Sequence, residues 1–103
     1  LPLAPEAAAR LDAAARALLA GVRPVLAGTE PFDEPTLEAA CRAHAERAGV
    51  RFASLAQALR VALTGSTVSP GLFEVAVVLG RAEVDGRLED AAMGRNPVLP
   101  AAN

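Results

Sequence analysis

Hydrophobic residues recur along this chain at intervals of three and four, the spacing of one buried face of an α-helix. Five segments show the pattern. Their apolar stripes are Leu11, Ala14, Ala15, Leu18 and Val22; Leu37, Ala40, Cys41, His44 and Ala48; Leu55, Leu59, Ala62 and Leu63; Leu72, Val75, Ala76 and Leu79; and Val84, Leu88, Ala91 and Ala92. No two alternating segments are joined by turn residues, as a strand pair would be. The sequence therefore predicts an all-α fold, a compact bundle of about five short helices.

Helix-ending residues set the expected boundaries. The first helix opens at Pro5, is interrupted at Gly21 and Pro24, and gives a further turn that ends at Gly28. Asp33 is expected to cap the second helix, which closes at Gly49. The remaining helices are expected over residues 54–64, 70–79 and 82–93. Residues 94–103 show no periodicity, so the chain is expected to be one domain over residues 1–93 with a flexible C-terminal tail.

The stretch from Gln57 to Gly80 contains a helix stop followed closely by a helix start. Gly65 suits a left-handed C-terminal cap, and Ser69 before Pro70 has the pattern of an N-cap followed by proline at the first helical position. Arg60 shares a helix face with Gln57 and Thr64 and has no acidic residue three or four positions away. An unpaired arginine near the free N–H groups of a helix start predicts a corner rich in hydrogen-bond donors. The alternative is that Arg60 only solvates its helix or caps carbonyl groups.

The amino-acid composition and charge limit which partners this chain is expected to bind. The formal net charge is −2, and all ten basic residues are arginine. An acidic balance argues against a generic nucleic-acid binder, so RNA binding would need a local patch. Charged residues spaced i, i+4 predict surface ion pairs in four places: Glu6–Arg10, Asp12–Arg16, Glu38–Arg42 and Arg42–Glu46. Twenty-five alanines and 3% aromatic residues favour closely packed helices over sheets.

Signals for catalysis are weak. Cys41 and His44 have a spacing that suits two metal ligands on a helix, but a structural zinc site needs four. Both residues lie on an apolar stripe, which favours core packing. A single cysteine excludes an internal disulfide and fits a reducing compartment. The longest apolar run, residues 75–79, is far shorter than the roughly 20 residues of a membrane span. The chain by itself is not expected to be an enzyme.

Three segments resemble a known family. Leu59-Arg60-Val61-Ala62-Leu63-Thr64-Gly65, Ser69-Pro70-Gly71-Leu72-Phe73-Glu74 and Leu79-Gly80 look like the C-terminal anticodon-binding domain of bacterial glutamyl-tRNA synthetase, a class I enzyme. The resemblance covers residues 3–93 and implies an all-α cage of helices. It also implies a cytoplasmic parent with an upstream catalytic domain, absent here, that uses ATP and Mg, whereas this domain needs no cofactor. The implied partners are a glutamate-accepting tRNA and the upstream domains, with no membrane and no DNA.

The resemblance also implies site residues. In the family, the matching arginine and the residues that open the next helix contact anticodon bases, which carries over to Arg60, Ser69, Pro70 and Leu72. A guanidinium can donate to a base edge or stack on its face, and an apolar surface can support an unstacked base. Thr64, Gly65 and Gly71 are expected to shape the loop. The chain departs from the family at Ala58, where proline is common, and at His44, where an aromatic residue is common.

Two other hypotheses stay open. The alanine-rich stripes and the acidic balance also suit a helical protein–protein interaction module without an RNA role. The other hypothesis is a domain that serves only to stabilise its parent protein. The sequence leaves open whether the parent also charges the glutamine tRNA.

Overall fold

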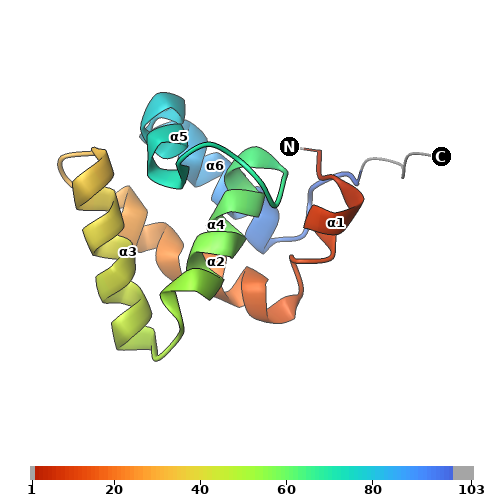
Figure 1. Ribbon diagram of the computed structural model, residues 1–103, viewed down its shortest axis with the longest axis horizontal. Coiled ribbons are helices and arrows are strands. Elements are labelled where there is room, and N and C mark those ends of the chain that lie inside the picture. Colours follow the sequence, from red (N-terminus) through yellow and green to blue (C-terminus); the bar gives the residue numbers. More distant parts are fainter. Residues whose placement is uncertain (1, 99–103) are drawn as a thin grey trace.

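The computed structural model describes residues 2–98 and shows six α-helices among them (Figure 1). They are α1 (Pro5–Ala8), α2 (Ala13–Ala27), α3 (Glu34–Ala48), α4 (Phe52–Thr64), α5 (Leu72–Leu79) and α6 (Arg81–Ala92). The only β-type pairing in this part of the chain is an isolated bridge between Leu3 and Val98. The all-α prediction is confirmed, with one helix more than the pattern indicated.

Most helix ends match the residues that predicted them. The Asp33 carboxylate accepts a hydrogen bond from the Thr36 N–H at 3.0 Å and caps α3. Gly49 and Gly65 end α3 and α4 in the left-handed region, at φ 69° and 73°, where a side chain would be strained. The helix predicted over residues 54–64 begins two residues earlier, at Phe52. The segment predicted over residues 82–93 is α6, shifted by one residue at each end.

The predicted first helix is wrong in two respects. The chain breaks into α1 and α2 after Ala8, because the Asp12 carboxylate accepts a hydrogen bond from the Ala15 N–H at 2.9 Å and caps a new helix there. Conversely, α2 runs without interruption through Gly21 and Pro24. Proline removes one backbone hydrogen bond, but less than one turn follows it, and packing holds the helix.

A single core joins five of the six helices. The central residues are fully buried and come from different helices: Leu19 and Val22 from α2, Leu37 from α3, Leu59 from α4 and Leu88 from α6. The α2 stripe is turned slightly from the predicted one, since Leu19 and Leu26 are buried, Leu11 and Leu18 are half-buried, and Ala14 is exposed. On α3, Ala45 is buried and Ala48 is exposed. The predicted stripe on α4 is confirmed.

Helices α2 and α6 are also tied by charge. Arg23 donates from Nε and Nη2 to the two carboxylate oxygens of Asp85, at 2.7 and 3.0 Å, in a two-pronged pair. Glu89, one turn along α6, approaches the same Nη2 at 3.0 Å. This contact joins residues 62 positions apart in the sequence.

The ends of the described chain meet beside α4. The Leu3 N–H donates to the Pro97 carbonyl at 2.8 Å, and the Ala4 N–H donates to the Gly65 carbonyl at 3.2 Å. Leu3 and Ala7 pack against Val61, which forms a second, smaller core on the far side of α4. Figure 1 shows α1 on the side of the domain opposite α3. Residues 94–98 of the predicted tail therefore lie against the domain, and residues 99–103 lie outside the described residues.

Candidate nucleic-acid interface

The C-terminal turn of α4 is held by three kinds of hydrogen bond. The Thr64 hydroxyl donates to the Arg60 carbonyl at 2.7 Å, and the Gly65 N–H donates to the Val61 carbonyl at 2.8 Å. Arg87 of α6 donates from Nη1 to the Leu63 carbonyl at 2.6 Å and pairs with Glu83 on its own helix. The bonds to the Val61 and Leu63 carbonyls satisfy groups that a helix end leaves unpaired. The backbone that carries Arg60 is consequently fixed in place.

The loop over residues 65–71 is folded by its own side chains. The Ser66 N–H donates to the Thr64 hydroxyl oxygen at 3.2 Å, and the Val68 N–H donates to the Ser66 hydroxyl oxygen at 3.2 Å. Short hydroxyl side chains often make such bonds to nearby backbone groups. Thr64 and Gly65 thus lie within the hydrogen bonds at this turn, and their loop-shaping role stays a prediction.

Arg60 and Ser69 meet across this loop. The Arg60 Nε donates to the Ser69 hydroxyl oxygen at 3.0 Å, and that hydroxyl donates to the Pro70 carbonyl at 2.8 Å. The prediction that Ser69 caps the next helix is therefore wrong, since its hydroxyl is engaged elsewhere. Helix α5 begins at Leu72, and its N-cap is Gly71 at φ −47° and ψ 125°. Pro70 accordingly lies in the loop and not at the first helical position.

Most donors of the Arg60 guanidinium have no acceptor among the residues that the structure describes. It carries five N–H groups, of which the Nε–H is used on Ser69. Among residues 2–98, no carboxylate forms an ion pair with Arg60, and the side chain is half-buried. Fixing Nε sets the plane of the guanidinium, so the terminal N–H groups are oriented for a planar acceptor before any ligand arrives.

The start of α5 adds backbone donors beside this arginine. No side chain caps α5, and the N–H groups of Leu72, Phe73 and Glu74 have no acceptor among the described residues. The first turn of a helix also carries the positive end of its dipole. The corner thus combines one charged donor group with a row of neutral ones.

Exposed apolar surface lies on the same loop. Pro70 is exposed, and Val68 is 79% exposed. Leu72 is only 5% exposed and belongs to the core, so its side chain offers little surface to a ligand. Val68 is not among the predicted site residues, although a single branched apolar residue in a polar loop was a signal for it.

Comparison with known proteins agrees with this geometry. A family model described as "Anticodon binding domain" matches residues 2–92. This chain belongs to that family.

Curated relatives of the anticodon-binding domain are glutamate–tRNA ligases. The chain is 46% identical over 93 residues to the glutamate–tRNA ligase of Bradyrhizobium sp. (strain ORS 278), an alignment that covers 90% of this chain and 20% of that protein. It is 51% identical over 77 residues to the ligase of Rhodopseudomonas palustris (strain HaA2), covering 75% of this chain and 16% of that protein. It is 47% identical over 90 residues to glutamate–tRNA ligase 2 of Brucella ovis, an alignment that covers 87% of this chain and 19% of that protein. The chain spans about one fifth of the length of these relatives.

Elsewhere in the anticodon-binding domain, Cys41 takes the packing role that was predicted, whereas His44 is half-buried and lies outside the core. Cys41 is fully buried, and burial, with a smaller effect from Glu38, raises the pKa of its thiol to about 12. Such a thiol stays protonated and is a poor metal ligand or nucleophile. Over residues 2–98, no group of three His, Cys, Asp or Glu side chains is arranged to hold a metal ion. In the same range no helix has both the length and the apolar character to cross a bilayer.

Proposed function

We propose that this domain recognises the anticodon of a glutamate-accepting tRNA for a glutamate–tRNA ligase. The observation that carries the proposal is the Arg60 guanidinium, oriented by Ser69 and flanked by the uncapped start of α5. Membership of the anticodon-binding family and the names of the relatives support it. Unstacked anticodon bases present the donor, acceptor and ring surfaces that this corner can bind.

Each side chain has a distinct role in this proposal. The free N–H groups of Arg60 donate to the edge of one base or stack on its face. Pro70 and Val68 support a neighbouring base through their exposed apolar surface. Leu72 contributes through its backbone N–H, because its side chain is buried. Thr64, Gly65 and Gly71 keep the loop in shape, and Ser69 acts by holding Arg60.

The remaining parts of the proposal concern the whole ligase. A catalytic domain outside this chain would join glutamate to the tRNA with ATP and Mg, in the cytoplasm. The domain described here would raise the charging rate of tRNAs with the right anticodon. No residue of this chain is proposed to be catalytic.

The test is a charging assay with the natural ligase that contains this chain. Arg60→Ala should lower kcat/KM for tRNA by roughly tenfold to a hundredfold, since a hydrogen bond from a charged donor contributes about 1.5–3 kcal/mol. The KM values for glutamate and ATP should not change. Arg47→Ala, an exposed arginine at the end of α3, is the matched control. Charging by Arg60→Ala at the wild-type rate would remove Arg60 from the site.

A second arm tests whether bases are read. Wild-type ligase should lose efficiency on a tRNA with a changed anticodon base, whereas Arg60→Ala should be nearly indifferent to the base that Arg60 contacts. A double-mutant cycle over protein and tRNA measures this coupling directly.

A protein-interaction module remains the second candidate, because Val78 of α5 is 81% exposed and Val77 is 38% exposed. A salt titration separates the two candidates. Affinity for tRNA falls as salt rises if phosphates are contacted, and a module that binds only proteins shows no tRNA affinity to titrate.

A further inference from the structure

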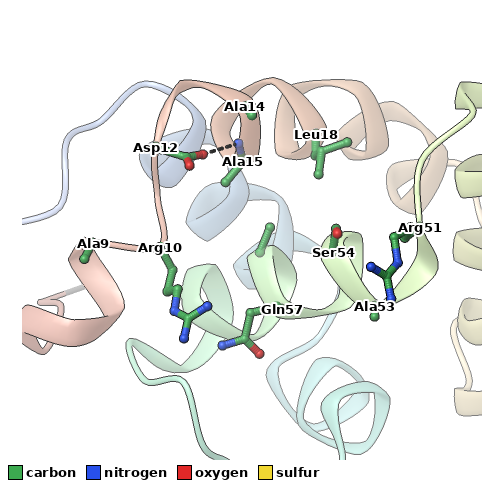
Figure 2. A pocket seen from close by; sticks show the side chains of 11 residues that line it. Ala9, Arg10, Asp12, Ala14, Ala15, Leu18, Arg51, Ala53, Ser54 and Gln57 are labelled. Atoms are coloured by element: carbon green, nitrogen blue, oxygen red, sulfur yellow. Dashed lines mark hydrogen bonds between the residues drawn. The ribbon is translucent and has the colours of Figure 1, made fainter.

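A hollow of about 610 Å³ lies between the start of α2 and the N-terminal half of α4. Its walls carry six polar or large side chains: Arg10, Asp12, Leu18, Arg51, Ser54 and Gln57. Figure 2 shows Arg10 entering from the link between α1 and α2, with its guanidinium directed toward Gln57, and Arg51 entering from the start of α4. Segments that are far apart in the sequence thus bring two guanidinium groups to one hollow, which we call the Arg10–Arg51 groove.

Neither arginine of this groove is paired with a carboxylate among the described residues. Neither Arg10 nor Arg51 makes an ion pair or a side-chain hydrogen bond among residues 2–98, and the predicted Glu6–Arg10 pair does not form. By contrast, five other arginines of the domain are paired with carboxylates: Arg23, Arg42, Arg81, Arg87 and Arg95.

One acidic residue lines the groove, and it is already engaged. The Asp12 carboxylate accepts the hydrogen bond from the Ala15 N–H that caps α2. This bond leaves the carboxylate charged, so the two arginines and Asp12 together leave the groove with an excess of one positive charge, on a chain whose formal net charge is −2. A local patch of this kind is what a nucleic-acid partner requires of an acidic domain.

The groove and the Arg60 corner share one face of α4. Residues 53, 57, 60 and 64 follow the i, i+4, i+7, i+11 spacing of one helix face. Ala53 and Gln57 line the groove, and Arg60 and Thr64 belong to the corner. At about 1.5 Å per residue, Arg51 lies roughly 13 Å from Arg60 along the helix, a span of a few nucleotides.

We propose that the Arg10–Arg51 groove holds the phosphate backbone of the same tRNA whose anticodon bases meet Arg60. This inference rests on the proposed function. Guanidinium groups bind phosphate oxygens in a two-pronged geometry, and Ser54 and Gln57 add neutral donors that suit phosphate or ribose. Contacts of this kind position an RNA without reading its sequence, which would complement the base contacts at Arg60. An acidic protein segment is the competing occupant, and the experiment separates the two.

The experiment measures binding of a tRNA transcript to the natural ligase over a series of KCl concentrations. The variants are Arg10→Gln with Arg51→Gln, the same pair changed to lysine, Arg60→Gln, and Arg47→Gln as a control that removes one surface charge outside the groove. The double glutamine variant should bind tRNA roughly tenfold more weakly. Its plot of log affinity against log salt should be shallower by about 1.4, at about 0.7 for each lost contact to a single strand. The lysine pair should keep the wild-type slope, because the charges remain.

A tRNA with a changed anticodon distinguishes the effect of the groove on binding from the effect of the Arg60 corner. The loss caused by the double glutamine variant should be the same for the cognate tRNA and for one with a substituted anticodon, whereas the loss caused by Arg60→Gln should depend on the anticodon. The groove proposal would be overturned if the double glutamine variant had the same tRNA affinity and the same salt slope as Arg47→Gln. The groove would then bind something other than tRNA, and the proposed function would still stand. A wild-type ligase that binds both tRNAs equally would instead overturn the proposed function. Circular dichroism of each variant checks that the helices are intact.

Discussion

Arg87 of α6 donates a hydrogen bond to the carbonyl oxygen of Leu63, 2.6 Å away at the end of α4. The contact reaches across 24 residues of sequence and ends beside the loop that carries Ser69. Because Glu83 holds the same guanidinium at 3.1 Å, the side chain bridges two helices. The position of the proposed anticodon-binding corner thus depends on a residue whose hydrogen bonds go to Leu63 and Glu83 and not to the four predicted site residues.

Replacing Arg87 tests this dependence. Arg87→Met keeps much of the apolar stem and leaves the Leu63 carbonyl without its donor, so the free energy of unfolding should fall by about 1–2 kcal/mol. Urea denaturation of the 103-residue chain measures this loss. Arg47→Met, which removes an exposed arginine without an ion pair among the described residues, should change stability little. Equal stability of the two variants would show that the Arg87 contact is dispensable.

The cap assignment gives a second prediction. Asp12→Ala should destabilise the domain by about 1 kcal/mol, because the Asp12 side chain caps α2. Ser69→Ala should have a smaller effect on stability, since Ser69 caps no helix. It should nevertheless weaken tRNA binding by the ligase, because the Arg60 guanidinium loses the acceptor that orients it. Ser69→Ala with unchanged tRNA affinity would mean that Arg60 needs no such support.

The Arg23–Asp85 pair between α2 and α6 makes the stability of the fold depend on pH in the acidic range. The hydrogen bonds from Arg23, together with its charge, hold the pKa of Asp85 below its usual value of 3.8. A carboxyl group whose folded pKa is lowered stabilises the fold fully above its unfolded pKa and loses this effect as pH falls through the folded value. Thermal unfolding followed from pH 6 down to pH 2 should therefore show a steeper loss for wild type than for Asp85→Asn. Parallel curves would contradict this coupling.

Cys41 offers a simple probe of global opening. Its thiol is fully buried with a pKa raised to about 12, so a maleimide at pH 7 should not react with the native domain. In denaturant, the same reagent should label one thiol per chain. Rapid labelling under native conditions would show that α3 opens without global unfolding. A variant with Asp12→Ala, which is destabilised but keeps Cys41 in place, should label faster than wild type.

Local signals predicted the parts of the fold that local chemistry controls. Gly49 and Gly65 ended their helices as expected because only glycine takes a left-handed backbone without strain. The predicted interruption at Pro24 does not occur, because the packing of Val22 and Leu26 outweighs one missing hydrogen bond. The contact between Arg23 and Asp85 spans 62 residues, and periodicity carries no information on such distant pairs.

In the candidate site, too, some features follow from the local sequence and others depend on how the chain folds. Gln57, Arg60 and Thr64 were placed on one face from their spacing alone. The hydroxyl of Ser69, however, had two possible partners, the start of the next helix and the Arg60 guanidinium, and only the folded loop decides between them. The proposed role of the corner in binding bases came from resemblance to a family. The Arg10–Arg51 groove could not be anticipated, because its two arginines come from segments whose approach depends on how α2 packs against α4.

The meeting of Leu3, Ala4, Gly65 and Pro97 affects how the domain can be trimmed. Two backbone hydrogen bonds tie the first described residues to the last ones and to the cap of α4. Fragment boundaries that remove residues 2–4 would leave the Gly65 and Pro97 carbonyls without these donors and uncover Val61. Truncation at one end would then release the other end and loosen the turn that leads into the loop over residues 65–71, so a shortened fragment should bind the proposed RNA partner more weakly than the intact domain.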